Sequence, residues 1–249
     1  MSVPVATEHD HRFCSSLEDS GFRPAAEKGF NARAALLNAA FWGRGVRLRV
    51  SFIDGALDLQ RRVAALAQAW PDETEANFGF EFWIDNGRDP TEADIRLTFQ
   101  PGIGSFSKLG RFAQAGDRTQ RTMNLGWMTM ALPDADARAV VLHEFGHALG
   151  LVHEHMNPAQ PIDWNKDKVR EDMRASQGWP DDKIDANMFR RYETSEIFGT
   201  DVDPTSIMMY PILPGWTKNG FTVDFNTTLS TADKALIRSA YGARPVFGG

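Results

Sequence analysis

Apolar and polar residues alternate in three short segments of the first hundred residues. This alternation is typical of half-buried strands, and it predicts strands over residues 46–52, 78–82 and 95–99. A polar loop from Asp85 to Glu92 separates the last two. We expect a further, edge strand near residues 104–109, in a stretch that is rich in Gly and Ser.

Three other segments carry helical signals. Apolar residues recur at helical spacing over residues 59–70, and Pro71 follows, which predicts an amphipathic helix that ends there. A second helix is predicted from Asp134 to Gly150, because acidic residues follow Pro133 and glycine is a common helix stop. Ser230 to Asp233 resembles a helix start, and the last helix is expected to end at Tyr241.

The remaining segments show little periodicity. Residues 1–40 read as an irregular arm leading into a short Ala-rich helix, and residues 161–230 read as charged and irregular, with several prolines. We therefore predict an α+β fold in which residues 41–249 form one domain, with a subdomain break near residue 150.

Composition excludes several classes of protein. With 42% apolar and 24% charged residues the chain is ordinary for a globular protein, and no apolar run approaches the roughly 18 residues of a membrane span. The net charge of −6 gives no reason to expect nucleic acid or anionic lipid as a partner. Cys14 is the single cysteine, which rules out an intramolecular disulfide. The first residues lack the basic and apolar regions of a secretory signal.

Candidate metal ligands lie in the predicted helix 134–150 and just beyond it. The segment from His143 to His153 matches the pattern H-E-x-x-H-x-x-G-x-x-H at every fixed position. His143 and His147 are four residues apart, so they share one helix face. Gly150 can take the left-handed conformation that lets the chain turn back and bring His153 to the same ion. Three imidazoles predict a zinc site with one open position for water.

Glu144 follows the first of these histidines in sequence and can accept a proton from that water. A lone histidine on an apolar helix face is more often a core residue than a ligand. Here four of the six histidines fall within residues 143–155, which favours the metal site.

Together with Ser206-Ile-Met-Met-Tyr210, this motif resembles the metzincin zinc peptidases, and within them the astacin-like group. The segment His153-Glu-His-Met-Asn-Pro158 is similar to a bacterial and fungal set of these enzymes. The chain differs from astacins proper in lacking their four disulfide cysteines and in having Met209 where a histidine is usual.

The resemblance implies a metzincin-like fold: a twisted mixed sheet with helices in an upper subdomain, an active-site cleft, and an irregular lower subdomain with a C-terminal helix. It implies a zinc-dependent endopeptidase with one catalytic Zn²⁺ and a protein or peptide substrate. Met208 would form an apolar floor beneath the metal, and Tyr210 would be a displaceable fifth ligand. Glu154 matches the acidic residue that anchors the mature N-terminus in astacins. The resemblance also favours a secreted protein, and we expect a monomer.

Other interpretations stay open. The same chemistry would support a zinc hydrolase acting on a non-peptide or cell-wall amide, and the ligands alone would suit a catalytically silent zinc-binding protein. Cys14 is ordinarily a small packing residue, but thiolates bind zinc strongly. On an N-terminal arm it could replace the water and keep the enzyme latent, and residues 1–40 would then be regulatory.

Overall fold

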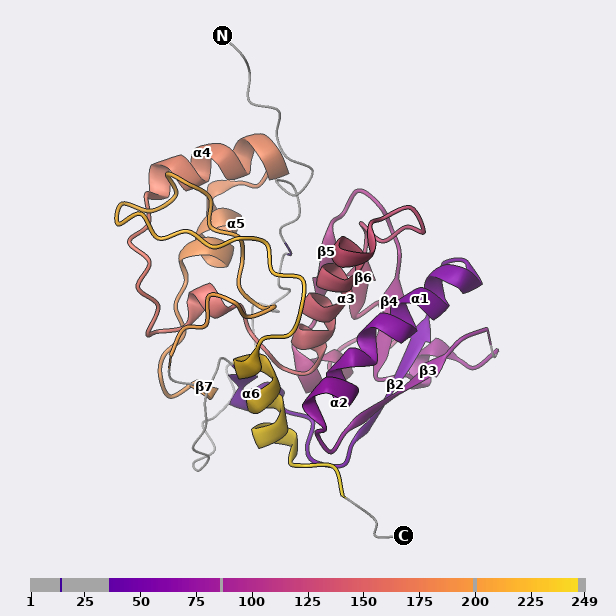
Figure 1. Cartoon of the computed structure of the whole chain (residues 1–249). Coiled ribbons are helices and arrows are strands. Elements are labelled where there is room, and N and C mark those ends of the chain that lie inside the picture. The colour runs from indigo at the N-terminus through magenta and orange to yellow at the C-terminus, as the bar shows by residue number, and fades with distance from the viewer. Residues whose placement is uncertain (1–13, 15–35, 86, 199–200, 246–249) are drawn as a thin grey trace.

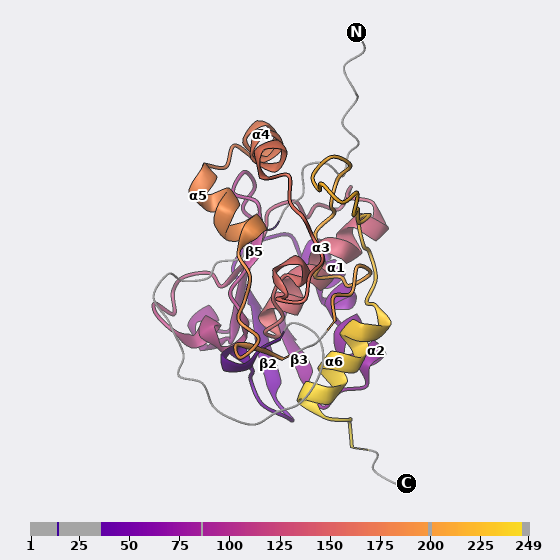
Figure 2. The same cartoon turned by 90° about the vertical axis from the view of Figure 1, so that its left-hand side faces the viewer.

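The computed structural model describes residue 14 and residues 36–85, 87–198 and 201–245. These residues form two halves (Figure 1). One contains a five-stranded sheet with the helices α1 (Leu57–Ala67), α2 (Ala69–Thr74) and α3 (Asp134–Ala148). The other contains α4 (Lys166–Gln177), α5 (Asp181–Ile184) and long loops. In the view turned by 90° this second half faces the viewer, with α4 at its top (Figure 2).

The sheet confirms all four predicted strands. Its order is β3-β2-β4-β6-β5, with β5 antiparallel to β6 and the other pairs parallel. The strands are β2 (Arg47–Phe52), β3 (Gly79–Trp83), β4 (Ile95–Thr98), β5 (Ser105–Ser107) and β6 (Met123–Leu125). The segment predicted near residues 104–109 is therefore the edge strand β5.

Helices cover one face of the sheet, and a loop covers the other. Alternate residues such as Leu48 and Leu97 pack with Val63 of α1 and Phe145 of α3 in the largest apolar core. On the opposite face the buried Arg96 donates to the carbonyls of Ala93, Ala113 and Gln120. These bonds hold the loop that contains the 3₁₀ turn Gly110–Gln114 against the sheet.

The predicted helix 59–70 is in fact two helices. The prediction that Pro71 ends the segment is wrong, because α2 begins at Ala69 and Pro71 lies in its first turn. Backbone N–H groups in a first turn have no partner within the helix, so proline is tolerated there. The predicted helix 134–150 is confirmed as α3.

The prediction that residues 161–230 are irregular is wrong for α4 and α5. Helix α4 buries only Val169 and Met173 along its length, so it has too few apolar residues to be recognised as a helix in a segment that is otherwise polar and charged. These residues pack with Trp164, Trp179 and Trp216 in a second apolar core. A π-helical turn, Asp185–Phe189, follows α5.

The segment before the first strand also departs from expectation. Leu36–Leu37 forms β1, which pairs with β7 (Ile197–Phe198), and Asn38–Ala40 is a 3₁₀ turn. No Ala-rich helix is present in this described part, and most of the predicted arm, residues 1–13 and 15–35, lies outside the described residues. Two further 3₁₀ turns are Pro90–Glu92 and Glu154–Met156.

The last helix, α6 (Thr231–Tyr241), is confirmed with its capping box, in which Ser230 and Asp233 exchange hydrogen bonds. It lies beside α2, against the half that contains the sheet (Figure 1). Within the residues that the structure describes, no helix is long and apolar enough to cross a membrane.

Candidate active site

Helix α3 carries His143, Glu144 and His147 through the middle of the molecule. Glu144 and His147 are almost fully buried, at 1% and 0% exposure. The side chain of His143 is hydrogen-bonded to the carbonyl of Ile207, in the segment that passes from one half to the other, with 2.8 Å between Nδ1 and the oxygen. The site therefore lies where the helix of one half meets the loops of the other.

A glycine ends the helix and redirects the chain. Gly150 has φ of 98°, in the left-handed region, and its N–H donates to the carbonyl of His147 while that of Leu151 donates to Gly146. This pair of bonds is the Schellman arrangement, which glycine adopts without steric cost. The turn returns His153 to the same point as the two helix histidines.

The three Nε2 atoms converge. The His147 and His153 nitrogens are 3.1 Å apart, and those of His153 and His143 are 3.2 Å apart. Two nitrogens that each lie about 2.0–2.1 Å from a tetrahedral zinc ion are about 3.3–3.4 Å apart. The observed spacing is close to that of three ligands around one ion.

The other ring nitrogens explain why a cation suits this arrangement. Nδ1 of His143 donates to Ile207 and Nδ1 of His147 donates to the carbonyl of Leu151, each at 2.8 Å. Both neutral rings therefore present a bare Nε2 lone pair. A proton on Nε2 of His153 can form a hydrogen bond with only one of these two lone pairs, whereas a metal ion can bind the Nε2 atoms of all three histidines. The donor set thus fits zinc.

Burial keeps the three imidazoles uncharged. It lowers the pKa of His143 to about 4 and moves the pKa values of His147 and His153 well below their usual range. Neutral imidazole is the form that binds a metal.

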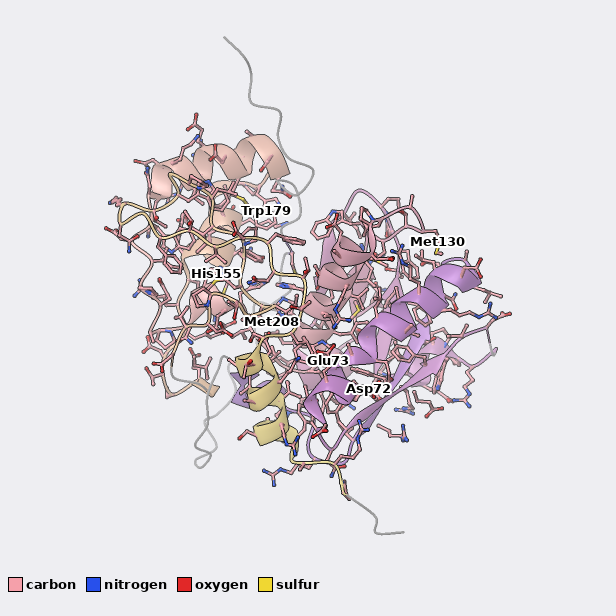
Figure 3. All side chains as sticks on the ribbon, viewed as in Figure 1. Asp72, Glu73, Met130, His155, Trp179 and Met208 are labelled. Carbon is pink, nitrogen blue, oxygen red and sulfur yellow. The ribbon has the colours of Figure 1, made fainter. Side chains whose placement is uncertain are left out.

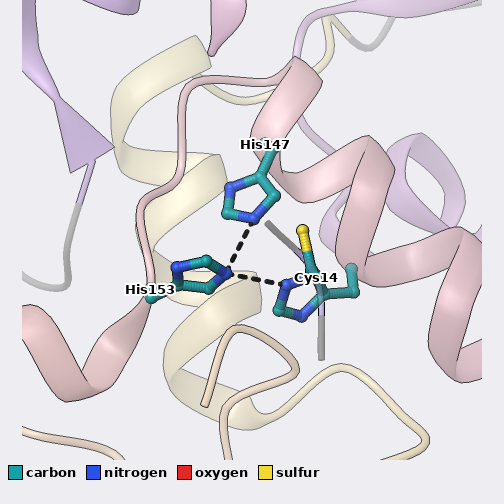
Figure 4. A group of neighbouring side chains, drawn as sticks. Cys14, His147 and His153 are labelled. Atoms are coloured by element: carbon teal, nitrogen blue, oxygen red, sulfur yellow. Dashed lines mark hydrogen bonds between the residues drawn. The ribbon is translucent and has the colours of Figure 1, made fainter. Parts of the chain in front are cut away.

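The thiol of Cys14 lies in the same place. Its sulfur and the three ring nitrogens all lie within 4.8 Å of one another, and Figure 4 shows the sulfur beside the rings of His147 and His153. The thiol also donates to Glu144, with 3.4 Å between Sγ and Oε2. Burial raises the pKa of Glu144 to about 8 and that of Cys14 well above its usual range. A dication at the histidines would instead favour the charged forms of both groups.

The segment 206–210 supplies the opposite wall. The Tyr210 hydroxyl donates to the backbone carbonyl of Cys14, and its ring centroid is 4.2 Å from that of His153. Met208 is buried at the boundary between the two halves (Figure 3). A Cβ atom added to Gly146 would meet the Met208 sulfur at 2.4 Å, so the methionine lies directly against α3. Glu154 is buried in the half that contains α4 and α5 and accepts from the N–H of Asp203.

Two residues of this site were missed by sequence reasoning. His155 stacks on Tyr210 with ring centroids 4.6 Å apart, and its Nε2 is 2.8 Å from the carbonyl of Asn187. Gly146 occupies a variable position of the metal motif, and nothing local shows that Met208 needs its missing side chain. Helical spacing could have placed Gly146 on the buried face, but not against a particular partner.

A cleft between the two halves contains Cys14, His143 and Glu144. The rest of its wall is mostly apolar, with Tyr210 and Asn226 as polar members beside Trp127, Ala139, Val140, Ile207, Met209, Pro211 and Phe225. A buried three-histidine site with a glutamate beside it, on a mixed sheet and at the base of a cleft, defines a metzincin-type zinc peptidase.

Comparison with known proteins agrees. The peptidase family described as Astacin matches residues 60–245, and the chain belongs to this family. The protein is therefore a zinc metalloendopeptidase that acts on proteins or peptides, and its α+β fold is the predicted one.

Solved structures show the same relationship. A structure of myroilysin is 35% identical, with a TM-score of 0.78, and the match covers 84% of this chain and 98% of that one. A crystal structure of myroilysin is 32% identical, with a TM-score of 0.61 and 97% coverage of both chains. High choriolytic enzyme 1, a hatching enzyme zinc-protease from medaka (Oryzias latipes), shares the fold at 16% identity, with a TM-score of 0.56 over 88% of this chain and 100% of that one. No protein with a curated description matches the sequence.

The contact between Gly146 and Met208 gives a stability prediction. Gly146→Ala forces the methionine sulfur to move, and overpacking of this kind costs about 1–3 kcal/mol. The better helix propensity of alanine, about 1 kcal/mol, offsets part of that loss. Urea denaturation should show that the substitution is less harmful in a Met208→Ala background than in the wild type. Equal effects in both backgrounds would contradict a direct contact.

Proposed function

We propose that His143, His147 and His153 hold one catalytic zinc ion and that Glu144 is the general base of peptide-bond hydrolysis. The observation that carries this proposal is the convergence of three ring nitrogens, with separations of 3.1 and 3.2 Å, next to Glu144. A silent zinc-binding site has no need of a buried carboxylate at this point, which disfavours that alternative.

Zinc, Glu144 and Tyr210 would each have a separate role in the reaction. Zinc at this point would polarise the substrate carbonyl and lower the pKa of water to about 7. Glu144 would take the proton from the attacking water on a carboxylate oxygen and pass it to the leaving amine. Tyr210 would donate from its hydroxyl to the oxygen that becomes negative, once that hydroxyl is released from the Cys14 carbonyl.

The cleft supports an extended polypeptide as substrate. Strand β5 lies at the edge of the sheet and packs beside α3. A substrate could add to this edge by backbone hydrogen bonds, while the apolar wall accepts a side chain. This arrangement favours a peptide over a cell-wall amide, and digestion of denatured protein but not of peptidoglycan would support it. We also propose that the protein is secreted, as the family resemblance implies, and that it acts as a monomer; fractionation and sedimentation would test these two points.

The base assignment predicts the behaviour of Glu144→Gln. The amide can hydrogen-bond water but cannot take its proton, so kcat/KM for a peptide should fall by about 10²–10⁴-fold. Elemental analysis should still find one zinc per chain in the variant. Glu171→Gln, on the exposed surface of α4, is the matched control and should keep full activity. Wild-type activity in Glu144→Gln would show that another group is the base.

The assignment of Tyr210 predicts a change in turnover rather than in substrate binding. Removing a donor that acts on the developing oxyanion costs about 10²–10³-fold in kcat, so Tyr210→Phe should lower kcat and leave KM nearly unchanged. Tyr192→Phe removes the hydroxyl of another buried tyrosine and should leave both constants unchanged. A change confined to KM would contradict the proposed role.

We propose that residues 1–40 keep the enzyme latent through Cys14. Its sulfur lies within 4.8 Å of the three ring nitrogens, and the same residue hydrogen-bonds to both Glu144 and the Tyr210 hydroxyl. A thiolate is a strong zinc ligand, so the sulfur would take the coordination position that water needs. The residue would thus engage all the groups assigned to catalysis.

Latency predicts that Cys14→Ala, or removal of residues 1–20, raises peptidase activity and makes it insensitive to thiol-modifying reagents. Cobalt in place of zinc gives a direct readout, since a sulfur ligand adds a thiolate-to-metal charge-transfer absorption. That absorption should be present in the full chain and absent from Cys14→Ala. If the two variants are no more active than the full chain and the absorption is unchanged, Cys14 is only a packing residue.

A further inference from the structure

Hydrogen bonds connect Asp233, in the first turn of α6, with a histidine of the metal site. Oδ1 of Asp233 accepts from the Ser206 hydroxyl at 2.7 Å, and the Ser206 oxygen accepts from the N–H of Met208 at 3.0 Å. The peptide unit that contains this N–H also contains the carbonyl of Ile207. That carbonyl accepts from Nδ1 of His143 at 2.8 Å.

The chemistry of each group determines which atom donates in each of these hydrogen bonds. A carboxylate only accepts, so the single hydroxyl hydrogen of Ser206 points to Asp233 and leaves a lone pair for Met208. The Ile207–Met208 peptide is then engaged at both its N–H and its carbonyl, and serial hydrogen bonds of this kind polarise one another. At the far end, the carbonyl holds the proton of His143 on Nδ1 and leaves Nε2 bare.

The second oxygen of Asp233 anchors the same segment. Oδ2 accepts from the backbone N–H of Ile207 and from that of Ser230, each at 2.9 Å. Asp233 is 2% exposed, so water does not compete for these bonds. The carboxylate therefore fixes both the start of α6 and the strip of backbone that holds His143.

The two histidines of α3 differ in how their rings are held. Nδ1 of His147 donates to Leu151, four residues along, within the turn that ends its own helix. Nδ1 of His143 depends on a carbonyl 64 residues away, on a segment whose position is set by Asp233. The orientation of His143 is thus controlled from α6.

We propose that Asp233 and Ser206 are positioning residues for metal binding, which fix the ring orientation and tautomer of His143 through the Ile207–Met208 peptide. This inference rests on the proposed assignment of His143 as a zinc ligand. Carboxylates often orient a metal-binding histidine by direct contact. Here a hydroxyl and a peptide unit extend that contact.

Zinc affinity separates this role from that of an ordinary helix cap. The full chain would be titrated with Zn²⁺ against a chelator of known affinity, alongside Ser206→Ala, Asp233→Asn and Ser230→Ala. Ser206→Ala breaks the series of hydrogen bonds between Asp233 and His143 but keeps both backbone bonds to Asp233. Ser230→Ala removes the capping hydroxyl but leaves that series of hydrogen bonds intact. Melting temperatures of the metal-free proteins would report the structural cost of each change.

We expect Ser206→Ala and Asp233→Asn to weaken zinc binding by about tenfold or more, the lower end of the effect of losing an outer partner. Ser230→Ala should bind zinc like the wild type, even though its melting temperature falls. If Asp233→Asn does not fold, Ser206→Ala decides the question.

Failure of this inference can be distinguished from failure of the proposed function. If Ser206→Ala binds zinc as tightly as Ser230→Ala and the wild type, Asp233 and Ser206 are purely structural and the inference is wrong, while the proposed function stands. If the wild type itself takes up no stoichiometric zinc, the proposed ligand set is wrong and the inference falls with it.

Discussion

Three imidazole nitrogens with their lone pairs directed at one buried point are the constraint on which the rest of the structure depends. Uncharged nitrogens 3.1–3.2 Å apart repel unless a proton or a cation lies between them. Each ring must therefore be fixed by other contacts before the ion binds. The carbonyls of Ile207 and Leu151 do this for two rings, and the left-handed turn at Gly150 delivers the third.

That requirement explains why the site lies between two separately packed halves. The core around the sheet fixes α3, and a second core around three tryptophans fixes the loops of the half that contains α4 and α5. Met208 belongs to the first core, whereas Met209 and Tyr210 belong to the second. The segment 206–210 thus crosses from one core to the other at the metal site. Movement of the halves relative to each other would disturb the ligands, the floor and the tyrosine together.

Local patterns in the sequence predicted much of the fold. Period-two alternation identified β2, β3 and β4, because each buries one face against α1 and α3 and turns the other to a different environment; β5 was expected from a Gly- and Ser-rich stretch instead. The metal motif placed three histidines and a glutamate together, since its spacing encodes a helix and a glycine turn. The prediction was wrong where local chemistry was ambiguous. Helix α4 buries two apolar residues and is otherwise mostly polar and charged. Pro71 was interpreted as the end of a helix, although proline is also tolerated in the first turn of one.

Contacts between distant segments were beyond the reach of the same reasoning. Thiol chemistry suggested Cys14 as a metal ligand, but no sequence pattern indicated its hydrogen bond with Glu144, which lies 130 residues away. Asp233 is a harder case, because its local role was visible: the pattern Ser230-x-x-Asp233 predicted a helix cap, and the cap is present. A carboxylate has two oxygens and several lone pairs, and the cap uses only part of this capacity. Satisfying one local pattern therefore says nothing about a second partner, which only the packing of α6 beside residues 206–208 reveals.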